Sequence, residues 1–225
     1  MMQDKRRVNP LHWLIMIIVG VSTLVSPMVL AEELPVSVKA ILPDNQIIKN
    51  AGYYDLLMKP GEKQKLEFEV HNSGDKEVTL KLAIHSAFTG DGGAFDYTRL
   101  SKEKDESLKI PLTDIATVDG NVSVPAKGST KVPIQLNMPD DAFEGIILGA
   151  IRVTQVEAES DDKKDNKKSG ISIDNKFAYV VAISLRNNDK EVEALLKLKS
   201  IGASQVAGRN TVKVQIQNPT PAMIS

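Results

Sequence analysis

The chain has 225 residues, with 28 basic and 29 acidic side chains and a formal net charge of −1. A balanced charge does not direct the surface toward nucleic acid, whose protein partners present a basic face or stripe. There is no cysteine, so disulfides and thiol chemistry are excluded and the fold must be held by its core.

The first 31 residues predict an export signal. A basic Lys-Arg-Arg group at residues 5–7 precedes an apolar run over residues 11–30, and Ala31 closes a small-residue cleavage pattern. Polar residues interrupt the run, whereas a spanning helix needs about 20 apolar residues, so an uncleaved membrane anchor is the less favoured alternative. We expect residues 1–31 to be removed and the remainder to be exported.

The exported part opens with strand patterns. Residues 35–42 and 53–58 are short apolar stretches, each closed by turn residues. Residues 65–71 (KLEFEVH) alternate apolar and polar side chains, and the same alternation resumes over residues 78–85 after an Asn-Ser-Gly-Asp turn. Residues 132–138 repeat the pattern, with a proline that favours an edge or a bulge. These patterns predict half-buried strands.

Two later stretches, residues 145–153 and 177–185, are apolar at nearly every position. Such runs are typical of strands buried on both faces. In the second stretch one side is bulky and the other is mostly small, at Ala178, Ala182 and Ser184. We expect the second domain or a partner protein to lie against that smooth side.

The strands predict an all-β domain. Residues 157–170 carry no large apolar side chain, which indicates a flexible hairpin tip more than a domain boundary. About seven or eight strands at this spacing favour an immunoglobulin-like β-sandwich, with a barrel as the open alternative. We expect this domain to span residues 32–187.

A second set of strands begins at residue 188. Residues 212–217 (VKVQIQ) are followed by Asn218, just as residues 66–71 are followed by Asn72. Two strands are supplied here, whereas a sandwich of about seven needs roughly 100 residues. Residues 188–225 are therefore expected to be the first strands of an incomplete second sandwich, in a chain that is the amino-terminal piece of a longer protein.

The residues needed for catalysis are scarce. His71 and His85 fall on the polar side of their strands, where solvated histidines are a simpler interpretation than a metal or acid–base role. None of the common motifs for metal-dependent proteolysis, serine nucleophiles or phosphate binding is present. Asp91 and Asp96 lie among glycines, but their spacing matches no calcium loop. The sequence predicts no enzyme, no cofactor and no metal.

Aromatic rings are candidate platforms for sugars. Tyr53 and Tyr54 are adjacent, so in an extended segment one ring faces inward and the other outward. An outward Tyr54 or Tyr97, with amide and carboxylate groups nearby, would suit a glycan. Turn formation by residues 43–45 explains the same loop without a ligand and is the favoured alternative. The candidate ligand-binding residues are Asp44, Asn45, Gln46, Tyr54, Asp96 and Tyr97.

Residues 38–79, 138–151 and 176–189 together resemble the WxL-interacting protein family of Gram-positive bacteria. The resemblance implies a cell-surface protein with two tandem immunoglobulin-like domains. The first would bind peptidoglycan and the second host matrix proteins or a partner, alongside WxL-domain surface proteins. It also implies a carboxy-terminal membrane anchor, which residues up to Ser225 do not include, and it supplies no catalytic residues.

Two functional hypotheses follow. The leading one is a non-enzymatic binding protein that associates with peptidoglycan and with WxL-domain surface proteins at the Gram-positive cell wall. The alternative is a structural spacer or assembly scaffold that contacts only proteins, through strand addition at an exposed edge or through an apolar sheet face.

Overall fold

A computed structural model describes residues 35–98, 105–156 and 177–224, which all belong to one compact unit, Leu34–Ser225. The expected signal at residues 1–31 and the expected flexible loop at residues 157–170 lie outside the described residues. Within the described part, no helix combines the length and the hydrophobicity needed to cross a membrane.

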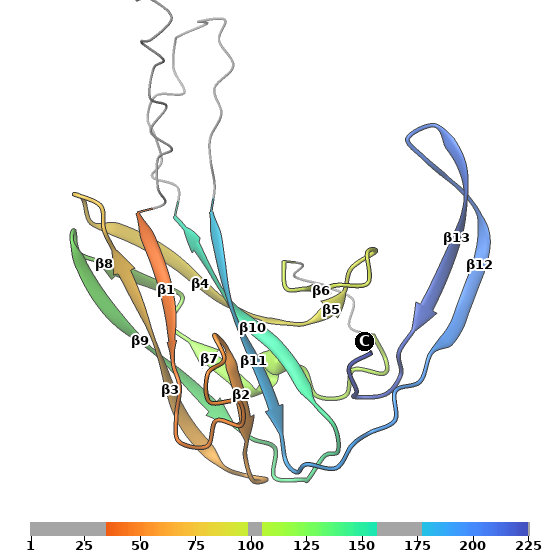
Figure 1. The fold of residues 1–225 in the computed structure, drawn as a ribbon, viewed down its shortest axis with the longest axis horizontal. Coiled ribbons are helices and arrows are strands. Elements are labelled where there is room, and N and C mark those ends of the chain that lie inside the picture. Colours follow the sequence, from red (N-terminus) through yellow and green to blue (C-terminus); the bar gives the residue numbers. More distant parts are fainter. Residues whose placement is uncertain (1–34, 99–104, 157–176, 225) are drawn as a thin grey trace, which may run out of the picture. The chain divides into compact units, whose positions relative to one another are not determined.

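Two sheets form a β-sandwich (Figure 1). The four-stranded sheet contains, in spatial order, β1 (Val36–Ile41), β3 (Lys63–Asn72), β9 (Gly128–Asn137) and β7 (Ala116–Val118). The five-stranded sheet contains β2 (Tyr54–Leu57), β11 (Ala178–Arg186), β10 (Ile147–Gln155), β4 (Val78–Ser86) and β8 (Asn121–Val124). The pairing is antiparallel except between β2 and β11. The predicted all-β, immunoglobulin-like sandwich is confirmed, and two separate sheets replace the alternative of a closed barrel.

The alternating pattern of β3 explains how the core forms. Leu66, Phe68 and Val70 are buried, while the residues between them are half-buried or exposed. The same alternation in β9 buries Val132, Ile134 and Leu136 against it. Pro133 lies one residue beyond the segment of β9 that pairs with β7, so its missing N–H removes no hydrogen bond to that strand.

The sequence over-predicted burial in β11. Its core side is buried, and on the other side Ser184 is buried too. Ala178 and Val180, however, are exposed on that side. The expectation of burial on both faces is therefore wrong for the first half of β11, because no described element covers it.

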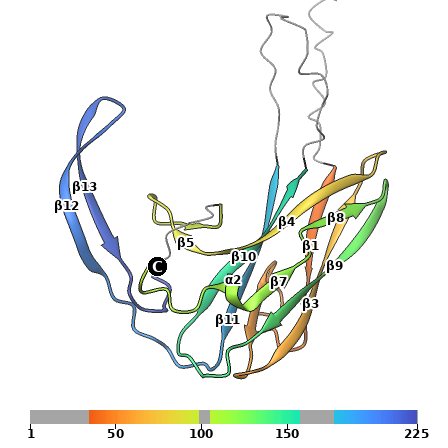
Figure 2. The ribbon, with the colours of Figure 1, turned by 180° about the vertical axis from the view of Figure 1, so that it is seen from behind.

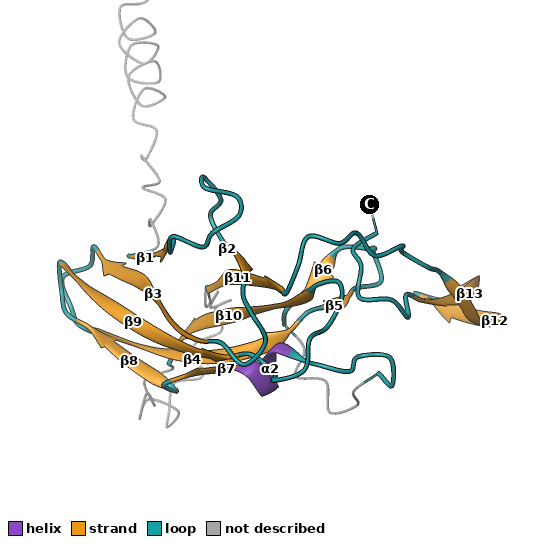
Figure 3. Cartoon of the chain, turned by 90° about the horizontal axis from the view of Figure 1, so that it is seen from below, coloured by secondary structure: helices purple, strands orange, loops and turns teal. Residues whose placement is uncertain are grey.

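One short helix, α2 (Leu112–Ile115), fills the end of the core and lies against β4, β7 and β10 (Figures 2 and 3). Gly149 of β10 is required there, because a Cβ atom would lie 2.5 Å from Leu112 Cδ2 and 2.4 Å from the His85 carbonyl. The small side chain lets the helix approach the sheet directly.

Two tyrosine hydroxyls connect the sheets. Tyr54 of β2 donates to the Glu67 carbonyl of β3 at 2.6 Å, and Tyr179 of β11 donates to the Val36 carbonyl of β1. Buried tyrosine hydroxyls normally need such a partner, since an unmade hydrogen bond is costly inside a protein.

The predicted second set of strands is a hairpin of β12 (Lys197–Val206) and β13 (Arg209–Gln217). A further small sheet pairs β5 (Phe88–Thr89) with β6 (Phe95–Asp96). The large apolar side chains of the β12–β13 hairpin remain mostly exposed, including Leu198, Ile201, Val212, Val214 and Ile216.

Candidate binding surface

The loop between β1 and β2 is braced by Gln46, which is 3% exposed. Its Oε1 accepts from the Asp55 amide at 3.1 Å, and its Nε2 donates to the carbonyls of Ile48 and Tyr53 at 3.1 and 2.9 Å. All three side-chain hydrogen bonds of Gln46 are made with backbone groups of this loop and of β2. Gln46, which the sequence predicted as a ligand contact, therefore supports the backbone.

The neighbouring residues of the predicted glycan site are also turned inward. Asn45 and Gln64 exchange two side-chain hydrogen bonds of 2.9 Å, and Asn45 also donates to the Leu57 carbonyl at 3.3 Å. Asp44 is exposed, and its carbonyl accepts from the Lys49 ammonium at 2.7 Å. Of the three loop residues that the sequence singled out, only Asp44 has an exposed side chain.

The expectation that Tyr54 faces outward is wrong. Tyr54 has no exposed surface, whereas Tyr53 is 37% exposed. Tyr54 shares its side of β2 with Leu56 and pairs in register with Ile183, so its ring lies in the core. Burial raises the pKa of the Tyr54 phenol well above its usual range. A sugar ring cannot stack on a buried ring, so Tyr53 is the tyrosine available to a ligand here.

Asp96 lies in β6 of the separate two-stranded β5–β6 sheet, and Tyr97 follows it directly. Asp96 Oδ1 accepts from the amide and the hydroxyl of Thr98, both at 2.7 Å, which is a local turn. Tyr97 is half-buried, and this burial raises the pKa of its phenol. Among the described residues, no group of three or more His, Asp or Glu side chains is placed to hold a metal ion.

The outward side of β2 and β11 carries an apolar surface that we call the outer face. Ala178, Val180 and Ala182 share this side of β11, while Ser184 is buried on it. The sequence found these small residues but missed the larger side chains beside them. The register of β2 on β11 places Leu57, and Tyr53 just before β2, on the same side. Ile47 also faces this side, because its amide donates to the Asp55 carbonyl at 2.8 Å and the two residues lie opposite each other. The outer face therefore consists of Ile47, Tyr53, Leu57, Ala178, Val180 and Ala182, four of which are large or aromatic and 37–43% exposed.

A buried ion pair supports the outer face. Arg186 Nη2 lies 2.8 Å from Asp55 Oδ1, and the side chains are 25% and 3% exposed. The pair connects β2 with the end of β11, across 131 residues of sequence. Removing one member of such a pair leaves the other charge without its partner, which typically costs about 3–5 kcal/mol. No sequence pattern indicated this contact, because the two residues are so far apart in the chain.

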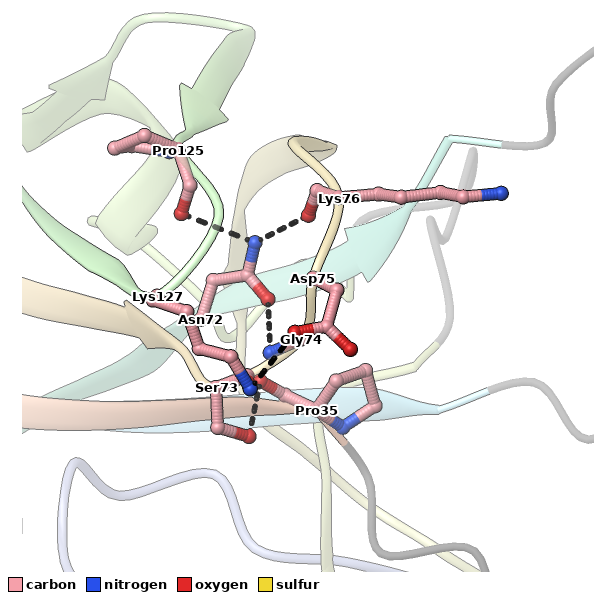
Figure 4. Close-up of polar contacts among 8 residues, drawn as sticks. All are labelled: Pro35, Asn72, Ser73, Gly74, Asp75, Lys76, Pro125 and Lys127. Atoms are coloured by element: carbon pink, nitrogen blue, oxygen red, sulfur yellow. Dashed lines mark hydrogen bonds and ion pairs between the residues drawn. The ribbon is translucent and has the colours of Figure 1, made fainter.

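The Asn-Ser-Gly-Asp turn after β3 is built around the polar contacts of Asn72 (Figure 4). The Asn72 side chain is fully buried. Asn72 Nδ2 donates to the carbonyls of Lys76 and Pro125 at 2.7 and 3.1 Å, and Oδ1 accepts from the Gly74 amide at 2.9 Å. Asn72 therefore fixes its own turn and ties it to the turn between β8 and β9. These contacts are structural, because each polar atom of the side chain has a partner in the backbone.

An equivalent turn follows β13. Asn218 Nδ2 donates to the Ala222 carbonyl at 2.7 Å, and Oδ1 accepts from the Thr220 amide at 3.1 Å. Partners two and four residues ahead are the ones that Asn72 uses in its own turn. The internal repeat that the sequence indicates is thus present as two equivalent asparagine turns.

Two family models match the chain in succession. Residues 36–155 match the peptidoglycan binding domain of the WxL Interacting Protein, and residues 168–225 match the host binding domain of the same protein. The chain belongs to the WxL-interacting protein family. The resemblance in the sequence is therefore confirmed, and the two matched domains support a binding role at the cell surface.

Several solved structures are similar to the chain at low sequence identity, and a search of curated proteins gave no match. The ASH/PapD-like domain 7 of human CEP192 has 13% identity and a TM-score of 0.39, covering 85% of this chain and 99% of that one. The Salmonella enterica SafA pilin in complex with the SafB chaperone has 11% identity and a TM-score of 0.38, covering 83% of this chain and 69% of that one. The Pseudomonas aeruginosa CupB2 chaperone has 15% identity and a TM-score of 0.35, covering 74% of this chain and 67% of that one. Because these identities and TM-scores are low, the assignment of a β-sandwich rests on the strands and sheets of this chain.

The boundary between the two WxL-interacting protein models does not coincide with the boundary of the sandwich. The first match ends at residue 155, the end of β10, and β11 falls inside the second match. In the structure, β11 lies between β10 and β2 in the five-stranded sheet. The first sandwich therefore includes a strand that the family models assign to the second domain.

Proposed function

We propose that this chain is a non-enzymatic, exported protein of the Gram-positive cell wall that binds peptidoglycan with its sandwich and associates with WxL-domain surface proteins. Host matrix proteins would be engaged by the second domain. The observation that carries this proposal is the succession of a peptidoglycan binding domain and a host binding domain in one chain. Both matched families are binding domains, which supports a role without catalysis.

We further propose the outer face as the contact surface of the sandwich. Tyr53 offers an exposed aromatic ring in place of the buried Tyr54, and Asp44 offers an exposed carboxylate on the same loop. Asn45 and Gln46 contribute by holding the loop in shape, through the internal hydrogen bonds described above. A preformed loop loses little conformational entropy on binding.

A specific observation also favours the alternative of a protein-binding scaffold. Val180 and Leu57 are aliphatic and exposed, and exposed apolar clusters of this kind commonly mark protein contacts. Strand addition at β2 is disfavoured, because its carbonyls at Asp55 and Leu57 already accept from Ile47 and Asn45. A partner protein would therefore contact the face of the sheet, at Ala178 and Ala182, more readily than that edge.

Co-sedimentation of the exported chain with purified sacculi tests the proposal. We expect retention well above that of an unrelated exported β-sandwich of similar charge. Retention equal to that control would reject peptidoglycan binding. Ala182→Glu tests the outer face as a protein contact, since it should abolish capture of a WxL-domain protein. Unchanged capture by this variant would reject that contact.

A further inference from the structure

The asparagine turn after β13 contacts the first sandwich. Pro221, inside that turn, accepts a hydrogen bond of 2.8 Å from the amide of Ile146, in the loop between β9 and β10. Asn218 shapes the turn from within, through its bonds to Thr220 and Ala222. The carbonyl of Pro221 is thereby presented to the β9–β10 loop.

Gly145 makes this approach possible. Its φ is +82°, and a Cβ atom at this position would lie 2.2 Å from the Pro221 carbonyl oxygen and 2.8 Å from its Cγ. Two backbone segments therefore meet at a spacing that no side chain permits. By contrast, Gly93 and Gly208 also have positive φ, at +79° and +74°, but a Cβ atom there would meet nothing within 4 Å.

The same loop also holds the chain where it leaves β11. Asn187 Oδ1 accepts from the Phe143 amide at 2.9 Å, and Asn187 Nδ2 donates to the Met58 carbonyl at 2.8 Å. An exposed ion pair between Lys190 and Glu144, at 3.1 Å, follows along the connection. Exposed pairs contribute little, so Asn187 is the stronger of these two contacts.

The turn and the connection are also joined to each other. Thr220 Oγ1 accepts from the Leu195 amide at 3.2 Å, just before β12 begins. On the other strand, Gln217 Nε2 donates to the Asp105 carboxylate at 2.8 Å. The β12–β13 hairpin is therefore held on its exit side at two points, Gln217 and Pro221, and its entry side is tied to the same turn through Thr220.

From these contacts we infer that the β9–β10 loop is a built-in docking surface that fixes the first hairpin of the second domain on the first sandwich. A single anchor leaves a hairpin free to rotate, whereas two separate anchors remove that freedom. The junction is a rigid arm between the peptidoglycan binding domain and the host binding domain, and it keeps the second at a set orientation. This role goes beyond the proposed binding function and requires no ligand.

Spin-label distance measurements test the junction directly. The chain has no cysteine, so Lys131→Cys on β9 and Lys213→Cys on β13 would carry the only labels, and both positions are exposed. Double electron–electron resonance should give one narrow distance distribution in the otherwise unchanged protein. Gly145→Ala should broaden it, because the added methyl group displaces Pro221. Gly93→Ala is the matched control, since it places alanine at a similar positive φ in open space.

A second variant guards against a general folding defect. Asn218→Ala removes the turn without touching the sandwich, so it should broaden the distribution and abolish the protection of the Ile146 amide against hydrogen exchange. The thermal unfolding of the sandwich should stay unchanged in this variant. A broad distribution in the parent protein would overturn the inference. So would narrow distributions in both Gly145→Ala and Asn218→Ala.

Discussion

The hydroxyl of Tyr54 offers a sharp test of how the sandwich is held together. It donates at 2.6 Å to the Glu67 carbonyl and so connects the five-stranded sheet with the four-stranded sheet. Tyr54→Phe removes only the hydroxyl and keeps the ring in the core. The Glu67 carbonyl, at a part-buried position, then loses this donor.

The expected loss of stability can be estimated from that single bond. Leaving a buried acceptor without a donor costs about 1–3 kcal/mol, and we take about 2 kcal/mol for Tyr54→Phe. For a domain of roughly 150 residues, each kcal/mol lowers the melting temperature by about 2–4 °C. The variant should therefore melt about 4–8 °C below the parent protein.

Urea unfolding followed by circular dichroism measures the loss. The midpoint should fall while the slope of the transition stays constant, since the two proteins expose the same surface on unfolding. Tyr53→Phe is the matched control, because that tyrosine is 37% exposed and its change should cost less than about 0.5 kcal/mol. Equal midpoints for Tyr54→Phe and Tyr53→Phe would refute the role assigned to the Tyr54 hydroxyl.

Three further predictions concern the core and its edges. Asp55→Ala should destabilise the sandwich by about 3 kcal/mol, because Arg186 loses its partner, and the double change Asp55→Ala/Arg186→Met should recover part of that loss in urea unfolding. A chain ending at residue 167 lacks β11 and should show no cooperative thermal transition, whereas one ending at residue 187 should unfold cooperatively. The pKa of Tyr54 is raised by burial, so its contribution to stability is complete below about pH 10 and declines as the pH rises further. Ultraviolet titration should show one phenol that ionises only on unfolding, and this phenol should be missing in Tyr54→Phe.

Local patterns allowed the strands to be predicted. The alternation of Leu66, Phe68 and Val70 determines which side of β3 is buried, and the turn chemistry after it is confirmed by the contacts of Asn72. The repeat of this pattern before Asn218 was also visible in the sequence. In each case the information lies within a few residues of the structure that it specifies.

The candidate site was harder to predict, because it depends on contacts between distant segments. Tyr53 and Tyr54 are the same residue type, and only the register of β2 on β11 decides which ring is buried. Asp55 is buried by an arginine that lies 131 residues away. The small side of β11 was found from its spacing, but three of the larger residues that extend it, Ile47, Tyr53 and Leu57, come from β2 and the loop before it.

We propose that the outer face, through Tyr53 and not Tyr54, retains the chain on the cell wall. Sacculus co-sedimentation of Tyr53→Ala and Tyr54→Phe, at a temperature where both remain folded, compares the two rings directly. We expect Tyr53→Ala to lower the retained fraction by about threefold, as for the loss of an aromatic contact of about 0.6 kcal/mol, and Tyr54→Phe to leave it unchanged. Full retention of Tyr53→Ala would contradict the claim.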